Sequence, residues 1–151
     1  MMSRFKLAAG TLIIGLATAT ALTTAALADP ITDRQAAMKN VGKAMGALAA
    51  IAKKEAPFDA AVVAENATAI ANNVKAAKDL YPDGSDTGEK ETWAKAEIWA
   101  NKDDFAAKHD KSVEAAMAMA AVTEEANFGA ALGALGGTCK ACHETYRRPK
   151  E

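Results

Sequence analysis

Cysteine and histidine are scarce in this chain, which has only two of each among 151 residues. A closed zinc site needs four ligands, usually thiolates or imidazoles, and outside one short group the chain offers only His109. No stretch reads convincingly as a β-strand, so a dithiol of the thioredoxin type lacks its expected strand-helix-strand context. Basic runs and basic-aromatic interleaving are absent too, and nucleic acid is therefore not an expected partner.

The short group lies near the C-terminus, where the chain reads Cys139-Lys140-Ala141-Cys142-His143. C-x-x-C-H is the attachment signature of a c-type haem. Cysteines three positions apart share one face of a helix, so both thiols can reach the vinyl groups on one porphyrin edge. His143 is then placed to bind the iron. The motif predicts one covalently attached haem; a dithiol redox centre, half of a zinc site and a structural disulfide are the alternatives.

The N-terminal stretch has the order of a secretory signal peptide. Arg4 and Lys6 precede an apolar run over 7–27, and small residues end at Ala28, just before the first acidic residue. We expect cleavage after Ala28, which leaves one domain over 29–151 and no stable membrane insertion. Without the two leader cations, the 18 basic residues become 16 against 19 acidic ones, a formal charge of −3. An uncleaved membrane anchor is the alternative, although the run is only weakly hydrophobic.

Apolar residues recur at steps of three and four in four later segments, the pattern of helices that bury one face. The predicted helices run from 30 to about 54, from 59 to about 80, from 101 or 103 to at least 119, and from 125–128 to about 146. Thr32 or Asp33 is the expected N-cap of the first helix, and Asp59 that of the second. Together with 50% apolar residues, these segments predict an all-α, antiparallel four-helix bundle with the haem held along the C-terminal helix.

The segment before the third long helix carries both tryptophans, Trp93 and Trp99, in a predicted short helical turn. Each is expected to pack in the core, with a haem-edge contact as the alternative. His109 shares an apolar stripe with Phe105. Its sequence neighbours are charged, however, which predicts an exposed or boundary position and no ligand role.

The sequence resembles the class II c-type cytochromes, the cytochrome c' and cytochrome c-556 family, over residues 30–148. The resemblance rests on four blocks, Arg34-Gln35-Ala36-Ala37-Met38, Ala56-Pro57-Phe58-Asp59, Ala96-Glu97-Ile98-Trp99, and Gly136-Gly137-Thr138-Cys139-Lys140-Ala141-Cys142-His143 with Tyr146-Arg147. It implies an up-down-up-down bundle and attachment of the haem outside the cytoplasm, hence a periplasmic protein.

The resemblance also implies roles for single residues. Cys139 and Cys142 would hold the haem, and His143 would be the proximal iron ligand. Arg34 and Gln35 match first-helix positions that lie near a haem propionate in the family, and a guanidinium can pair with a carboxylate through two hydrogen bonds. Two further matches concern the surroundings of the haem, namely Arg147 near the proximal histidine and Trp93 near a haem-contacting loop.

Met38 decides between two branches of that family. At its position, cytochromes c' carry a bulky residue that does not bind iron, whereas low-spin members like cytochrome c-556 carry a methionine that does. The alternative is that Met38 simply fills space in the core, since methionine is a common gap-filler and Met45 lies on the same stripe. We expect Met38 to be the sixth ligand.

The sequence thus predicts a periplasmic one-electron carrier that works with redox partner proteins and is not an enzyme. His143 and Met38 would bind the iron of its single haem c in a low-spin state. A five-coordinate protein that binds nitric oxide or carbon monoxide, with Met38 not bound to iron, is the alternative. A helical metal-binding or partner-binding bundle without haem is the third. Monomer and homodimer are both compatible with the resemblance.

Overall fold

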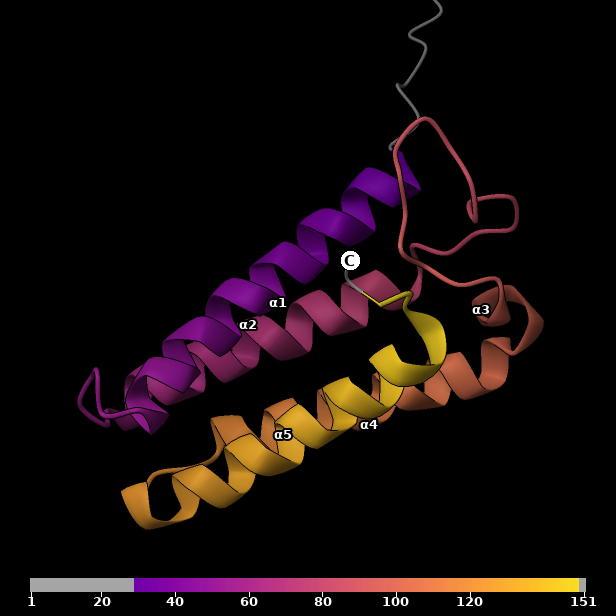
Figure 1. Cartoon of the computed structure of the whole chain (residues 1–151). Coiled ribbons are helices and arrows are strands. Elements are labelled where there is room, and N and C mark those ends of the chain that lie inside the picture. The colour runs from indigo at the N-terminus through magenta and orange to yellow at the C-terminus, as the bar shows by residue number, and fades with distance from the viewer. Residues whose placement is uncertain (1–28, 150–151) are drawn as a thin grey trace, which may run out of the picture.

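Four long helices and one short helix make up residues 29–149, the part of the chain that the computed structural model describes (Figure 1). They run in the order α1 (Pro30–Ala52), α2 (Ala60–Lys78), α3 (Glu97–Ala100), α4 (Lys102–Ala120) and α5 (Glu125–Tyr146). The predicted all-α bundle is confirmed, and its long helices begin and end within about two residues of the expected positions. The predicted leader and its cleavage site lie outside the described residues.

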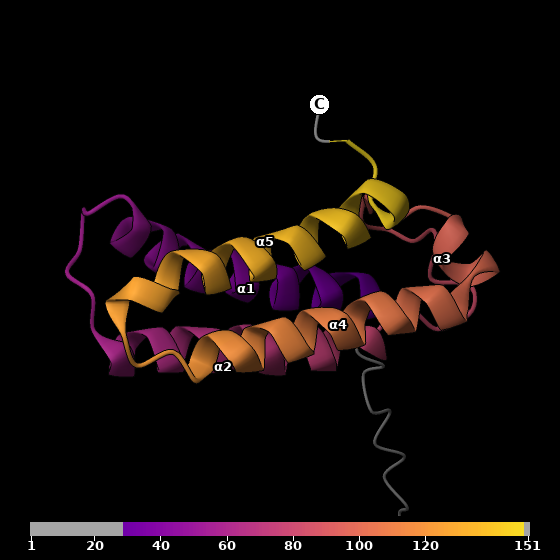
Figure 2. The same ribbon diagram turned by 90° about the horizontal axis from the view of Figure 1, so that it is seen from below.

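The long helices alternate in direction along the bundle (Figure 1). α1 packs on α2, α2 on α4 and α4 on α5, whereas α1 and α5 contact each other at only a few positions. Both views place the segment that carries α3 at the end of the bundle where α5 ends (Figure 2). None of the helices described is both long and apolar enough to cross a membrane. Because α1 and α5 have few contacts with each other, their facing sides are available to line a site.

Aspartates begin the first two helices. The Asp59 carboxylate accepts hydrogen bonds from the backbone of α2 at Ala61 (2.8 Å) and Val62 (3.2 Å), as predicted. The prediction for α1 was wrong, because its cap is Asp29, whose carboxylate accepts from the backbone N–H groups of residues 31 and 32. Pro30 explains the difference, since proline suits the first position of a helix and lets the helix start earlier.

Most buried side chains form one apolar core inside the bundle. Each long helix contributes a side chain that is fully buried, and these are Leu48, Ile70, Met119 and Leu135. Burial of side chains of this size contributes about 1.5–3 kcal/mol each. A smaller cluster of Ile98, Phe105 and Tyr146 lies at the α3 end of the bundle.

The stripe of α1 that carries Met38 and Met45 is less buried at these two positions than at the residues just before them. Ala37 and Ala44 are buried, whereas Met38 and Met45 are half-buried. Small side chains suit the extensive contact between α1 and α2. The two thioether side chains are left on the side of α1 that lines a cavity.

Candidate haem site

A cavity of about 550 Å³ is bounded by α1, α5, the start of α4 and the segment between α2 and α4. Its volume lies within the range of pockets that hold small molecules and cofactors. The lining includes every residue that the sequence predicts for the site, which are Arg34, Gln35, Met38, Cys139, Cys142 and His143. The fold thus brings two helices from opposite ends of the chain to one cavity.

The two cysteine thiols are free and half-buried in the cavity wall. Burial raises the pKa of the Cys139 thiol, and it raises the pKa of Cys142 to about 11. Dithiol redox centres need a lowered thiol pKa, so the surroundings of these cysteines argue against that alternative. Within residues 29–149, no three acidic, histidine or cysteine side chains form a group that could hold a metal ion. The zinc alternative therefore gains no support from the described part of the chain.

His143 lies in the cavity wall on the last turns of α5. Burial lowers the pKa of its imidazole, and the positive charge of Arg147 lowers it further. A lowered pKa keeps the ring neutral near pH 7, and the neutral ring is the form that binds a metal. The N–H of Arg147 donates the last hydrogen bond of α5 to the His143 carbonyl at 3.0 Å, and the extended backbone of Arg147 ends the helix at this point.

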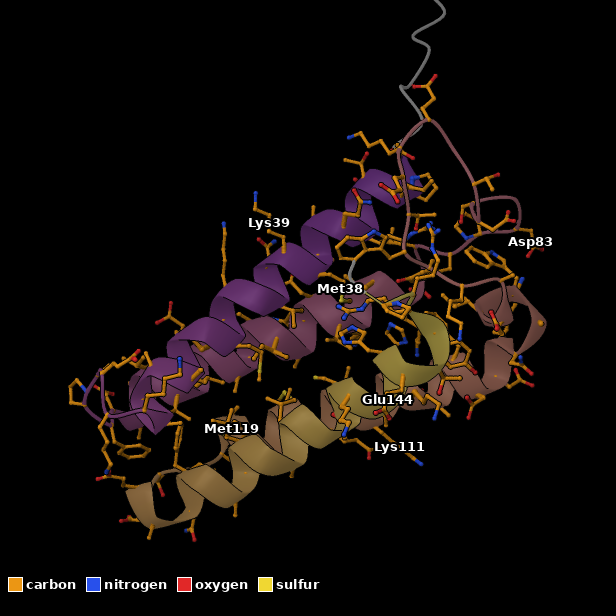
Figure 3. All side chains as sticks on the ribbon, viewed as in Figure 1. Met38, Lys39, Asp83, Lys111, Met119 and Glu144 are labelled. Atoms are coloured by element: carbon orange, nitrogen blue, oxygen red, sulfur yellow. The ribbon has the colours of Figure 1, made fainter. Side chains whose placement is uncertain are left out.

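Met38 projects from α1 into the space between α1 and the C-terminal half of α5, whereas the next residue, Lys39, points away from the bundle (Figure 3). Met45 lines the same cavity two turns further along α1. Because α1 and α5 run in opposite directions, Met38 lies toward the His143 end of α5 and Met45 toward the Cys139 end. Both methionines can therefore contact a bound group, and their positions along the cavity differ.

Arg34 is buried, with 3% of its surface exposed, and its terminal nitrogens bind the segment between α2 and α4. Nη2 donates to the Ser85 carbonyl (2.7 Å) and the Thr92 hydroxyl (3.0 Å). Nη1 donates to the Ser85 hydroxyl (3.0 Å) and, at 3.3 Å, to the Leu80 carbonyl. The guanidinium also lies 4.8 Å from the centre of the Tyr81 ring, a cation–π distance. In the structure Arg34 thus fastens this segment, and its role at a propionate stays a prediction.

The same segment is held from two other directions. The Gln35 side chain donates to the Glu91 carbonyl at 2.7 Å. On the opposite side, backbone N–H groups donate from Arg148 to the Trp93 carbonyl (2.8 Å) and from Lys95 to the Tyr146 carbonyl (3.0 Å). The segment therefore connects α1 to the end of α5 and covers one end of the cavity. Neither connection was visible in the sequence, because hydrogen bonds to backbone carbonyls leave no pattern in residue type.

The tryptophans take different places. Trp93 lines the cavity and is 40% exposed, so the expectation that it packs in the core was wrong. Trp99 is half-buried, packs against the cluster at the α3 end, and donates from Nε1 to the Pro82 carbonyl at 2.9 Å. Trp93 belongs to a segment that covers the cavity end, which explains why one side of its ring meets solvent.

His109 is buried, with 5% exposed, and the prediction of an exposed or boundary position was wrong. Its ring lies 4.3 Å from that of Phe105, and Nδ1 is 3.1 Å from the Phe105 carbonyl. Burial lowers the pKa of His109, which keeps it neutral. Tyr81, Phe105 and Tyr146 line the cavity beside it and were missed as site residues. Phe105 and Tyr146 lie on apolar stripes, and Tyr146 also belongs to a block of the resemblance, but neither signal identified them as site residues.

Comparison with known proteins agrees with this site. The family model described as Cytochrome C' matches residues 29–147. The chain belongs to the cytochrome c' family. A cytochrome c-556 from Agrobacterium fabrum is 45% identical over 125 residues, which cover 82% of this chain and 84% of the relative. A cytochrome c' from Rhodopseudomonas palustris is 37% identical over an alignment that covers 99% of each chain.

Solved structures extend the match to the fold. Cytochrome c' from Rhodopseudomonas palustris superimposes with a TM-score of 0.76 at 37% identity, over 82% of this chain and 98% of that one. A nitric oxide complex of a cytochrome c prime variant from Alcaligenes xylosoxidans gives a TM-score of 0.71 at 27% identity, over 81% and 95% of the two chains.

As a cytochrome of this family, the chain carries covalently attached haem c. The cavity fits that group, because it offers two free thiols, a neutral imidazole and a largely apolar wall on one side of the bundle. The cytochrome is thus either an electron carrier or a gas-binding protein.

Proposed function

We propose that this cytochrome is a one-electron carrier in which Cys139 and Cys142 hold the haem while His143 and Met38 bind its iron. The bound haem supplies the couple between ferric and ferrous iron. One observation carries the proposal: Met38 on α1 and His143 on α5 line the same cavity from its two sides. A thioether ligand raises the reduction potential and so favours the ferrous state.

The remaining side chains of the site suit a carrier better than a catalyst. The apolar wall around Met38 includes the buried side chains of Val41 and Ile98, which make this part of the site less polar. The Tyr146 hydroxyl donates to the Asp104 carboxylate at 2.5 Å, and burial together with that carboxylate raises the pKa of Tyr146 to about 12. A phenol with so high a pKa stays protonated near pH 7. Electron transfer without proton transfer is the chemistry that this arrangement supports.

Gas binding at a five-coordinate iron is the second candidate function. The specific observation in its favour is the likeness to a cytochrome c prime that was solved with nitric oxide bound. Under this function Met38 would be part of the cavity wall, as Met45 is, and the open coordination position would take nitric oxide or carbon monoxide.

Absorption spectra of the reduced holoprotein with and without carbon monoxide test the proposal. We expect a low-spin spectrum that carbon monoxide leaves unchanged, and we expect Met38→Leu to produce a high-spin spectrum that responds to the gas. Met45→Leu is the matched control, because it changes the other methionine of the same wall and should keep the wild-type spectrum. Both replacements conserve side-chain volume, so the packing cost of each is below about 1.5 kcal/mol. A wild-type spectrum that shifts with carbon monoxide would replace the carrier by the gas-binding function.

We also propose that the chain is exported, that its leader is cleaved after Ala28, and that the single domain over 29–151 works in the periplasm. The order of charged, apolar and small residues supports this proposal. The mass of the purified holoprotein should equal that of a chain beginning at Asp29 plus one haem. A mass that includes residues 1–28 would contradict cleavage. The same preparation gives the oligomeric state by sedimentation.

A further inference from the structure

A second, open cleft of about 540 Å³ lies on the surface beside the haem cavity, at the C-terminal end of α5. Glu144, labelled on α5 in Figure 3, marks its place. His143 and Arg147 line both the cleft and the haem cavity, so the two spaces adjoin at these side chains. The cleft is therefore the part of the surface that approaches the predicted iron ligand.

The side chains around this cleft are mostly cationic. Its lining contains Lys95, Lys140, Arg147 and Arg148, against the single carboxylate of Glu144. The chain as a whole is slightly acidic, with a formal charge of −1. A cationic region on an acidic protein is a local feature that average composition does not produce. We call this surface the cationic cleft.

Tertiary contacts assemble the cationic cleft. Three of its cations follow from the C-terminal sequence, but Lys95 comes from the segment before α3. An isolated antiparallel bridge pairs Ala94 with Arg147. Lys95 then donates to the end of α5 twice, from its backbone to the Tyr146 carbonyl (3.0 Å) and from Nζ to the Thr145 carbonyl (2.8 Å). Its ammonium group is held in place and contributes a fixed charge.

The positive charge of the cleft is only partly neutralised. Lys140 lies 3.6 Å from Glu144, but both side chains are largely exposed, and exposed pairs of this kind bind weakly. Lys95 lies 3.6 Å from Glu97. Neither arginine has a salt bridge to an acidic side chain among residues 29–149. The cleft therefore keeps a net positive charge that faces solvent.

We propose that the cationic cleft is the docking surface for an acidic patch on the redox partner protein. This proposal rests on the proposed carrier function and adds the place and the chemistry of the partner. One electron would pass from the ferrous carrier to a one-electron acceptor in the partner, with no bond made or broken and no proton moved. Redox complexes use small, short-lived interfaces, in which complementary charge raises the association rate more than the affinity. A small cationic cleft beside the iron ligand fits that kind of contact.

Stopped-flow oxidation of the ferrous holoprotein by hexacyanoferrate(III) tests the sign of the local charge. If the net charge of the protein controlled the reaction, this anion would react faster as ionic strength rises. We expect the opposite, a rate constant that falls as salt screens the cationic cleft. A cationic oxidant, tris(phenanthroline)cobalt(III), should show the reverse trend. A rate that rises with salt for the anion would overturn the proposal.

Variants at Lys140 locate the effect, because this side chain lines the cationic cleft and is absent from the haem cavity lining. At low ionic strength the hexacyanoferrate(III) rate constant should fall about twofold in Lys140→Gln and about fourfold in Lys140→Glu, as expected for unit charges near the path of an anion. Lys140→Arg should restore the wild-type rate. Lys43→Glu is the matched control, because Lys43 is an exposed residue of α1 that does not line the cationic cleft, and this change should alter the rate constant little. Equal effects of Lys140→Glu and Lys43→Glu would refute a local surface.

Competition separates a protein-sized acidic surface from a site for small anions. Poly-L-glutamate should slow the hexacyanoferrate(III) reaction of the wild type and have little effect on Lys140→Glu. Sodium sulfate at the same ionic strength should slow it no more than sodium chloride does. If sulfate competes as well as the polymer, the cleft binds small anions and the docking proposal fails. The carbon monoxide spectra report on the carrier function separately, because iron coordination does not set the sign of the salt dependence.

Discussion

Replacing Arg34 by glutamine should loosen the segment between α2 and α4 and destabilise the holoprotein. Arg34 makes three short hydrogen bonds to Ser85 and Thr92, at 2.7, 3.0 and 3.0 Å, from a side chain that is 3% exposed. Hydrogen bonds of a charged donor contribute about 1.5–3 kcal/mol each. Removing the guanidinium also removes the cost of burying it, which offsets part of that sum. We expect a net loss of about 3 kcal/mol, the contribution of one to two such hydrogen bonds.

Guanidinium chloride unfolding of the holoprotein measures this loss, and amide hydrogen exchange locates it. Exchange should accelerate in the segment that Arg34 holds, for example at the Ser85 N–H, which donates to the Pro82 carbonyl at 3.2 Å. Thr92→Val removes one acceptor of Arg34 from the other side. In a double-mutant cycle, the two changes should show a coupling energy of about 1 kcal/mol or more.

The reasoning would be refuted by a loss below about 1 kcal/mol together with unchanged exchange between residues 79 and 96. Additive effects of Arg34→Gln and Thr92→Val would also refute it. The cycle separates the observed role of Arg34 from its predicted role at a haem propionate. A propionate contact would change the pH dependence of the reduction potential in Arg34→Gln, and Thr92→Val would leave that dependence unchanged.

Two further predictions concern α4 and α5. Burial lowers the pKa of His109, so the unfolded chain binds the proton more readily, and this term removes stability as pH falls below about 6.5. His109→Gln should lose less stability than the wild type between pH 7.5 and 5, measured by unfolding of the holoprotein; an equal loss would contradict the assignment. Gly133 lies in the middle of α5, and a Cβ added there meets nothing within 4 Å. Gly133→Ala should therefore raise the free energy of unfolding by up to about 1 kcal/mol and leave the haem spectrum unchanged. A loss of stability would mean that the added methyl group clashes with a neighbour, which would contradict this prediction.

Local sequence signals predicted the helices well. The spacing of apolar residues sets which side of a helix is buried, and the Asp59 cap began α2 as expected. The α1 cap shows the limit of such signals. Asp29, Thr32 and Asp33 can all act as caps, and the choice between neighbouring candidates was made by Pro30, which fixes its own backbone for the first turn.

His109 shows why burial was harder to predict than periodicity. Its position on the stripe of Phe105 was recognised correctly, but its exposure was judged from the charged residues beside it in sequence. On a helix, adjacent residues point about 100° apart and share no face. The residues that surround His109 are Phe105, one turn before it, and Tyr81 from another part of the chain. His109 is therefore buried by residues that are close to it in space, and its neighbours in the sequence do not determine its exposure.

The sequence alone determined the cofactor and the helices of this cytochrome, because both depend on short-range spacing: C-x-x-C-H over five residues and apolar steps over a few turns. Tertiary structure decided which contacts distant residues make around the haem site. Met38 of α1 and His143 of α5 line the same cavity. Arg34 forms hydrogen bonds with the segment before α3, and Lys95 forms hydrogen bonds with the end of α5. These contacts join residues about 50 or more positions apart. Their formation depends on how the helices pack, which residue spacing does not encode.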